Sequence, residues 1–171
     1  MVLKRLFTFP DPVNEKAART VAAGVVMLSA AAIGARQPWL LVALAVGFWA
    51  RVLTGPTLSP LGRLATSVIA PALGKPKPVP GAPKRFAQGI GAAFSTAAVL
   101  LWFGVGAHVP ALAVTGALAG AAFLEAAFGL CLGCTIFGAL TRAGVIPTSV
   151  CEACADLSLH HSELRREAAR S

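Results

Sequence analysis

Two Cys-x-x-Cys pairs are the residues of this chain whose types and spacing most directly suggest chemistry. They are Cys131/Cys134 and Cys151/Cys154, and the sequence has four cysteines in all. Paired thiols can cycle between dithiol and disulfide, bind a metal ion as thiolates, or pack as small inert side chains. The pairs are separated by 16 residues, a spacing that also fits a four-cysteine zinc site. All three interpretations stay open: a redox relay, a zinc site and inert packing.

The second pair has the local sequence that most favours a reactive thiol. Ser149 is followed three residues later by Glu152, which is a capping-box pattern and predicts a short helix beginning near Val150. Cys151 then falls in the first turn, where the helix dipole stabilises a thiolate. In the redox interpretation Cys151 attacks a soluble partner and Cys154 resolves the mixed disulfide.

The first pair ends a long apolar run and is the membrane-side pair in this interpretation. On one continuous helix, Cys131 and Cys134 share a face, and Gly133 permits close approach of a partner or of another helix. Glu125 is the ionisable residue inside this run, and a charge at such depth usually has a partner. Six residues separate Glu125 from Cys131. We therefore expect no direct contact with the thiol and favour a bond to a neighbouring helix; a protonated carboxyl and a proton relay during thiol chemistry are the alternatives.

Two adjacent histidines beyond the second pair could add imidazole ligands to a zinc site. His160 and His161 lie on the predicted tail helix, where we expect ordinary surface residues. The sequence contains no phosphate-binding loop, no dinucleotide fingerprint and no Ser/His/Asp set. Cysteine chemistry is thus the one catalytic possibility that the sequence offers.

The composition places the chain in a membrane. Of its 171 residues 56% are hydrophobic and 13% are charged, against about 25% charged in soluble domains. Four apolar stretches are candidates for spanning helices, which need about 20 residues each. They cover residues 19–35, 38–54, 85–107 and 109–140. Polar residues between the basic start and the first stretch argue against a cleaved signal peptide.

The predicted fold is all-α: a polytopic membrane protein with four transmembrane helices. Residues 60–73 have apolar residues at helical spacing but are too short to span, which predicts an interfacial helix. Residues 1–141 form the transmembrane domain in this interpretation. Residues 142–171 form a cytoplasmic tail that carries the second cysteine pair and the short C-terminal helix.

Basic residues predict the orientation. All Lys and Arg except Arg36 fall at the N-terminus, in the 51–85 connection or after residue 141. The positive-inside rule then places both termini and both cysteine pairs on the cytoplasmic side. The net charge of +8 could also suggest nucleic acid, but these residues lie between apolar runs and follow no single polar helix face. We expect the lipid bilayer, and no nucleic acid, as a partner.

The residues also resemble a known family. The segments SPLGRLATSVIAPALGKPKPVPGAPKRFAQGIGAAFS and FLEAAFGLCLGCTIFGAL resemble the domain of unknown function 4395 family, which comprises small bacterial integral membrane proteins. The resemblance covers about residues 11–140. It implies that Cys131, Gly133 and Cys134 occupy the family's Cys-x-Gly-Cys signature, that the membrane is a bacterial cell membrane, and that the tail is an addition. It implies no activity.

The sequence therefore leads to two functional hypotheses. The first is thiol–disulfide or sulfur transfer at the cytoplasmic face, with a soluble partner of thioredoxin or sulfurtransferase type. The alternative is a non-enzymatic membrane scaffold whose tail is organised by zinc. All four cysteines carry either hypothesis: Cys131, Cys134, Cys151 and Cys154. A reducing cytosol disfavours a permanent disulfide, which argues for transient redox chemistry or for metal.

Overall fold

A computed structural model of the chain describes residues 11–146, and these residues are mostly helical, as predicted. A two-residue strand pair joins β1 (Val13–Asn14) to β2 (Pro78–Val79) in antiparallel register. Helices α4 and α5 are continuous with the π-helical turn η1, and α6 continues into a second such turn, η2. The helical elements are α2 (Glu15–Gly34), α3 (Trp39–Thr54), α4 (Pro60–Leu64), η1 (Ala65–Ile69), α5 (Ala70–Ala72), α6 (Gly81–Val99), η2 (Leu100–Gly104), α7 (His108–Phe128) and α8 (Leu132–Arg142).

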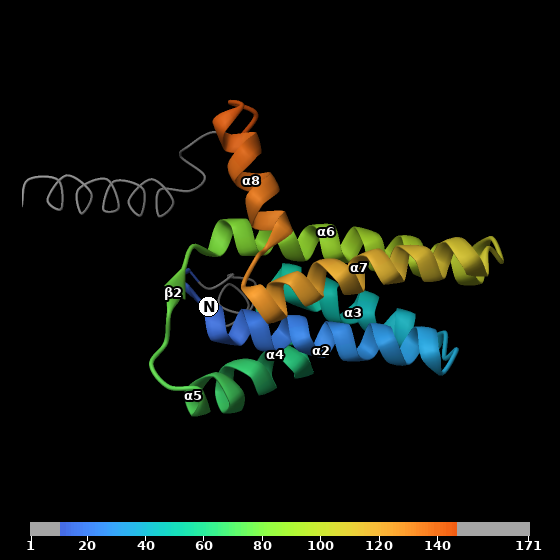
Figure 1. Cartoon of the computed structure of the whole chain (residues 1–171), viewed down its shortest axis with the longest axis horizontal. Helices are drawn as coiled ribbons and strands as arrows, with labels where there is room; N and C mark the ends of the chain where they lie inside the picture. The colour runs from blue at the N-terminus through green and yellow to red at the C-terminus, as the bar shows by residue number, and fades with distance from the viewer. Residues whose placement is uncertain (1–10, 147–171) are drawn as a thin grey trace, which may run out of the picture.

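Four long helices form a bundle, and a fifth leaves it. Helices α2, α3, α6 and α7 lie alongside one another, whereas α8 projects away from the bundle at a steep angle (Figure 1). Helix α2 packs most extensively on α7, and α3 on α6. The start of α2, the start of α6 and the end of α7 all lie at the same end of the bundle, next to the strand pair (Figure 1). We call this the polar end.

Three of the helices are long and apolar enough to cross a membrane. They are Glu15–Gly34, Gly81–Gly104 and His108–Phe128. Helix α3 is apolar but has only 16 residues, or about 24 Å of helix rise. At the end of the bundle away from the polar end, Trp39 lies 5.4 Å from Phe103 between ring centroids. Aromatic rings are enriched at membrane interfaces, which suits this position.

Small residues let the bundle helices approach closely. The main core cluster mixes alanines with a few large side chains: Ala22, Val25, Leu44, Phe48, Ala92, Leu118 and Ala122. At Gly91 on α6 an added Cβ would overlap the ring of Phe48 on α3. Close helix packing through small residues is the usual way that apolar helices associate when burial from water contributes little.

The polar end is held by bonds between segments that are far apart in sequence. The Asn14 side chain caps α2 by accepting the Lys16 N–H at 3.1 Å, and it also accepts the Lys77 N–H at 3.3 Å. Asp11 Oδ1 accepts the first N–H of α6, from Gly81, at 3.0 Å. These caps satisfy backbone donors that helix starts leave free. The cap at Asn14 also explains why α2 begins at Glu15, four residues before the predicted start.

Two sequence-based boundaries can be compared directly with the helices. The predicted helix over 60–73 is present as the continuous helical segment 60–72. The prediction of one helix over 109–140 is wrong, because α7 ends at Phe128 and α8 begins at Leu132. The predicted C-terminal helix near Val150 lies outside the described residues.

Candidate functional site

The break between α7 and α8 is made by a glycine. Gly129 has φ +72°, a left-handed conformation that favours glycine, and its N–H donates to the Glu125 carbonyl at 3.0 Å. The Leu130 N–H then donates to the Leu124 carbonyl at 3.2 Å. The chain therefore turns out of α7 two residues before the first cysteine.

An arginine from another helix completes the end of α7. The Arg19 guanidinium on α2 donates to the Ala126 carbonyl at 3.0 Å and to the Ala127 carbonyl at 2.9 Å. The last carbonyls of a helix have no partner within the helix and carry its negative partial charge. Arg19 supplies hydrogen-bond donors to these carbonyls and a positive charge beside them. It thereby fixes the end of α7, which the cysteine segment follows.

Cys131 begins a new helix. It is the N-cap of α8 in an extended conformation, and its Sγ accepts the Cys134 N–H at 3.3 Å. The Cys131 carbonyl accepts the Thr135 N–H at 3.0 Å and the Thr135 hydroxyl at 3.1 Å. The first pair thus occupies the helix-start position that the sequence predicted for Cys151. The expectation that both cysteines lie within one continuous membrane helix is wrong because Gly129 ends that helix first.

The two sulfurs are bonded to each other. Cys131 and Cys134 form a disulfide with 5.2 Å between their Cα atoms. Cys131 is 8% exposed, whereas Cys134 is half-buried. In this state neither sulfur is the thiolate that zinc requires. Cys134 is therefore the more exposed of the two residues.

Gly133 allows α8 to lie against the start of α6. A Cβ at Gly133 would stand 2.5 Å from Ala87 Cβ and 2.6 Å from Ala87 Cα. The predicted close approach at this glycine is therefore present, and its partner is helix α6. Phe137 on α8 is buried with its ring 5.5 Å from that of Phe86. These contacts hold the disulfide against the bundle even though α8 projects away from it.

Cys131 lies between two hollows of opposite character. One, of about 570 Å³, opens at the polar end and has Glu15, Lys77 and Lys84 in its wall together with both cysteines. The other, of about 330 Å³, is lined almost wholly by apolar side chains from α2, α3, α6, α7 and α8. Cys131 is in the wall of both hollows, so the disulfide borders a charged cleft on one side and an apolar hollow on the other.

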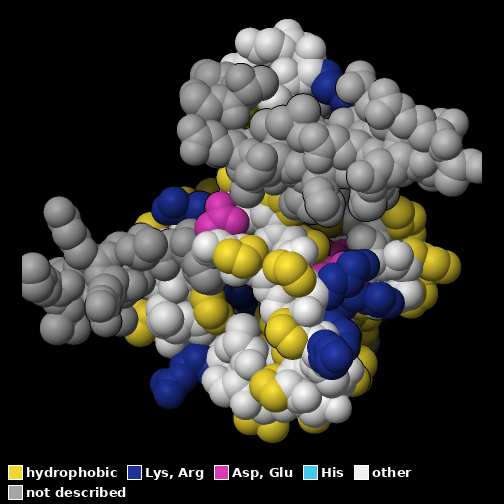
Figure 2. Space-filling view, turned by 90° about the vertical axis from the view of Figure 1, so that its left-hand side faces the viewer, with side chains coloured by type: hydrophobic (Ala, Val, Ile, Leu, Met, Phe, Trp, Pro, Cys, Tyr) yellow, Lys and Arg dark blue, Asp and Glu magenta, His cyan; other side chains and the backbone are white. Residues whose placement is uncertain are grey.

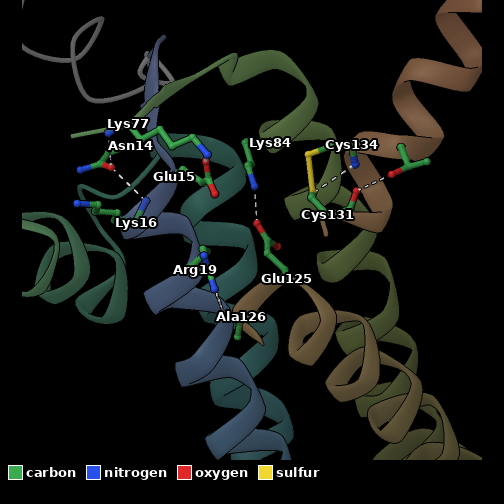
Figure 3. A network of polar contacts seen from close by, with 11 residues as sticks. Asn14, Glu15, Lys16, Arg19, Lys77, Lys84, Glu125, Ala126, Cys131 and Cys134 are labelled. Atoms are coloured by element: carbon green, nitrogen blue, oxygen red, sulfur yellow. Dashed lines mark hydrogen bonds and ion pairs between the residues drawn. A yellow bond between two sulfur atoms is a disulfide. The ribbon is translucent and has the colours of Figure 1, made fainter. Parts of the chain in front are cut away.

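Glu125 is paired, as predicted, with a neighbouring helix. Its Oε1 lies 2.5 Å from Lys84 Nζ on α6, and the two side chains are 16% and 11% exposed. Glu125 lines the apolar hollow and Lys84 lines the charged one. Figure 3 shows this ion pair pointing inward beside the disulfide. Glu125 and Cys131 therefore both border the apolar hollow.

A second ion pair lies on the rim of the charged cleft. Glu15 Oε2 lies 2.7 Å from Lys77 Nζ, joining the start of α2 to the segment before β2. Figure 3 shows Glu15, Arg19, Lys84 and Glu125 gathered on the α2 side of the disulfide. Viewed end-on, the polar end carries basic and acidic side chains around an apolar surface (Figure 2).

Comparison with protein families places the chain. The model of the domain of unknown function DUF4395 matches residues 13–142. The chain belongs to the DUF4395 family. The match covers the bundle, the first cysteine pair and α8, and it ends where the tail begins. No curated protein and no solved structure matches the chain.

The remaining predicted site residues of this DUF4395 chain lie outside its described part. These are Cys151 and Cys154 of the second pair and the neighbouring His160 and His161. Within residues 11–146 no group of three or more His, Cys, Asp or Glu side chains is placed to hold a metal ion. The four-cysteine zinc hypothesis needs the tail, so it stays a prediction.

Two residues of the site carry no distinguishing signal in the sequence. Arg19 and Lys84 resemble ordinary topology signals, although Arg19 caps α7 and Lys84 neutralises Glu125. Gly129 offered a readable signal, because glycine commonly follows the last residue of a helix. Cysteine is a rare N-cap residue, so the start of α8 had no comparable signal.

Proposed function

We propose that this DUF4395 protein exchanges electrons through Cys131 and Cys134 with a soluble dithiol protein of thioredoxin or sulfurtransferase type. The observation that carries the proposal is a cysteine pair at a helix N-terminus, with one sulfur accepting a backbone N–H. A helix start stabilises a thiolate, and a stabilised thiolate is a good leaving group in disulfide exchange.

The difference in burial between the two cysteines supports different roles for them. In the proposal a thiolate of the partner attacks Sγ of Cys134, the more exposed residue, and forms a mixed disulfide. The S–S bond breaks, and Cys131 leaves as a thiolate that the Cys134 N–H stabilises. The second thiol of the partner then attacks the mixed disulfide and releases Cys134. The partner is oxidised to its disulfide, and Cys131/Cys134 is reduced by two electrons.

The second pair extends this scheme along the chain. Cys151 and Cys154 follow the described residues and carry the predicted capping box. In the proposal the tail pair is a second route to the same disulfide. Once the partner has reduced the tail pair, the Cys151 thiolate attacks Cys134 Sγ, and Cys131 leaves as a thiolate. Cys154 then attacks Cys151 and releases Cys134, so that the tail pair becomes a disulfide and Cys131/Cys134 a dithiol.

The proposal places the bundle in a bacterial cytoplasmic membrane with four crossings. Helix α3 is short, but it is apolar and packs along α6, which supports a fourth crossing. The polar end, with Lys77, Lys84 and Arg19, is the cytoplasmic end under the positive-inside rule. Cysteine labelling in intact cells tests this orientation. In a cysteine-free background, a membrane-impermeant maleimide should label Ala107→Cys and not Lys75→Cys, and the reverse pattern would refute it.

Trapping tests the exchange itself. The probe is a thioredoxin with one active-site cysteine, activated as a mixed disulfide with thionitrobenzoate. In a background without Cys151 and Cys154, Cys131→Ser should capture the probe through Cys134 and release the coloured thiolate. Cys134→Ser should react more slowly because Cys131 is buried. A variant that keeps Cys151 and Cys154 but lacks Cys131 and Cys134 measures separately whether the tail pair captures the probe.

Two outcomes would contradict the proposal. One is that neither single-cysteine variant captures the probe. The other is that thioredoxin fails to reduce the Cys131–Cys134 disulfide in the purified protein, as counted by alkylation and mass. Metal analysis of the same sample tests the scaffold alternative, because about one zinc per chain that is lost with any of the four cysteines would support it.

A further inference from the structure

Arg51 is a buried cation near the end of α3. Its side chain is 5% exposed. Its Nε donates to Gln88 Oε1 at 2.8 Å, and its Nη1 donates to the Ser59 hydroxyl at 3.2 Å. The guanidinium carbon also lies 4.5 Å from the centroid of the Phe48 ring. Each of these partners is neutral, so hydrogen bonds hold the guanidinium in place but leave its charge uncompensated.

The described part of the chain supplies no carboxylate to this cation. Arg51 Nη2 is buried and has no hydrogen-bond partner. Of the acidic side chains within residues 11–146, Glu15 pairs with Lys77 and Glu125 with Lys84, while Asp11 accepts the Gly81 N–H. An unpaired buried charge costs several kcal/mol, and buried charges are normally paired. Arg51 is therefore a buried cation with an unpaired donor, and an anion would complement both.

A hollow of about 230 Å³ adjoins Arg51. Its wall includes Lys84 and Gln88 from α6, Thr66 from η1, and the turn at Gly55 and Pro56. Lys84 is the second cation here, and its charge is balanced by Glu125 on the other side. The hollow thus has polar groups from three segments, an apolar face from α2, and a net surplus of one positive charge.

We propose that this hollow binds a phosphate-type oxyanion. Guanidinium groups present a planar set of donors that matches two oxygens of one phosphate, and Arg51 lies in the wall of the hollow with one guanidinium nitrogen unpaired. A water molecule could satisfy the hydrogen bond, but it would leave the charge unbalanced. The site is independent of the cysteines and does not depend on the proposed redox function.

The neighbouring surface suggests where such an anion comes from. The helical segment 60–72 forms one side of the hollow through Thr66 and exposes Leu64 and Val68. Exposed apolar side chains beside an anion site suit the acyl chains of a phospholipid whose phosphodiester enters the hollow. Free phosphate has the same oxyanion chemistry without the chains.

Binding to purified protein tests the site and separates these two sources. The probes are short-chain phosphatidylglycerol and inorganic phosphate, compared with monoolein, which has no phosphate, and with sodium chloride at equal ionic strength. The variants are Arg51→Met and, as a matched control, the exposed Arg63→Gln. Native mass spectrometry and thermal unfolding in detergent measure binding. A phosphate-bearing probe should raise the unfolding midpoint of the wild-type protein in a saturable way, because it binds the folded state.

Loss of Arg51 should weaken binding by about tenfold or more, since hydrogen bonds to charged groups are the strong ones. Arg63→Gln should bind like the wild-type protein. Saturation by phosphatidylglycerol alone identifies a lipid headgroup, whereas competition by inorganic phosphate identifies a soluble anion. If Arg51→Met does not fold, Arg51→Lys keeps the charge without the planar donors and should bind more weakly. Equal binding by the Arg51 and Arg63 variants would overturn the site, as would failure of both phosphate probes to bind the wild-type protein.

Discussion

Replacement of Gly133 by alanine tests whether the contact between α8 and α6 holds the disulfide in place. The new Cβ would stand 2.5 Å from Ala87 Cβ and 2.6 Å from Ala87 Cα, both well inside van der Waals contact. Ala87 Cα belongs to the backbone of α6 and cannot rotate away, so one helix must shift. Overpacking of this kind costs about 1–3 kcal/mol. The alanine returns up to about 1 kcal/mol of helix propensity. With this full gain subtracted, the net loss is roughly 0–2 kcal/mol, so the overpacking cost is best read from the difference between this variant and a control glycine that has no such contact.

The chain offers a matched control on the same helix. A Cβ at Gly138 meets nothing within 4 Å. Gly138→Ala should therefore keep only the propensity gain and stabilise α8 slightly. Both variants make the same chemical change, so their difference isolates the contact with Ala87.

Unfolding in detergent micelles, followed by circular dichroism, measures the two free energies. The rate at which dithiothreitol reduces the disulfide gives a second measurement. Gly133→Ala should expose Cys131 by moving α8 off the bundle and so speed reduction, whereas Gly138→Ala should not. Equal stability of the two variants, together with equal reduction rates, would refute the packing argument.

Three further perturbations test the polar end. Arg19→Gln should cost about 1–2 kcal/mol, because the Ala126 carbonyl loses a charged donor, and hydrogen exchange at the end of α7 should quicken. Lys84→Met should cost about 3 kcal/mol by leaving Glu125 unpaired, while the double variant with Glu125→Leu should recover much of this loss in a double-mutant cycle. Under reducing conditions Cys131→Ser should match or exceed the wild-type stability, and Cys131→Ala should fall about 1 kcal/mol below Cys131→Ser, because only serine keeps an N-cap acceptor. Equal unfolding midpoints for the serine and alanine variants would show that the cap at α8 contributes nothing.

The helical architecture was readable from the sequence because apolar length reports directly on helices of this kind. The stretches predicted at 19–35, 38–54 and 85–107 correspond to α2, α3 and α6 with its η2 extension within a few residues. The fourth stretch was misjudged, since hydropathy continues through residues 129–131 and only the backbone at Gly129 ends the helix. Hydropathy identifies segments that are apolar enough to lie in a membrane. It does not show where a helix ends within such a segment, as α7 does before Gly129.

The candidate site was only partly readable, because much of it depends on contacts between distant segments. The cysteines and Glu125 stand out by residue type alone. Lys84, Arg19 and Arg51 look like ordinary topology signals, and their individual roles depend on which helix lies opposite. The approximate helix ends can be predicted from the sequence. The packing of α2 on α7 and of α3 on α6 cannot, because it depends on the three-dimensional arrangement.

That pairing has a consequence for how the chain is assembled during synthesis. Helix α2 packs chiefly on α7, and α3 on α6, so the pairs are nested one inside the other. The inner pair is complete while α2 still lacks its main partner. At about 5–20 residues per second, His108 follows Gly34 from the ribosome after roughly 4–15 seconds. Arg19 cannot cap α7 until Ala126 and Ala127 have followed His108. Closure of the bundle and placement of the cysteine pair are therefore the same late event in biogenesis.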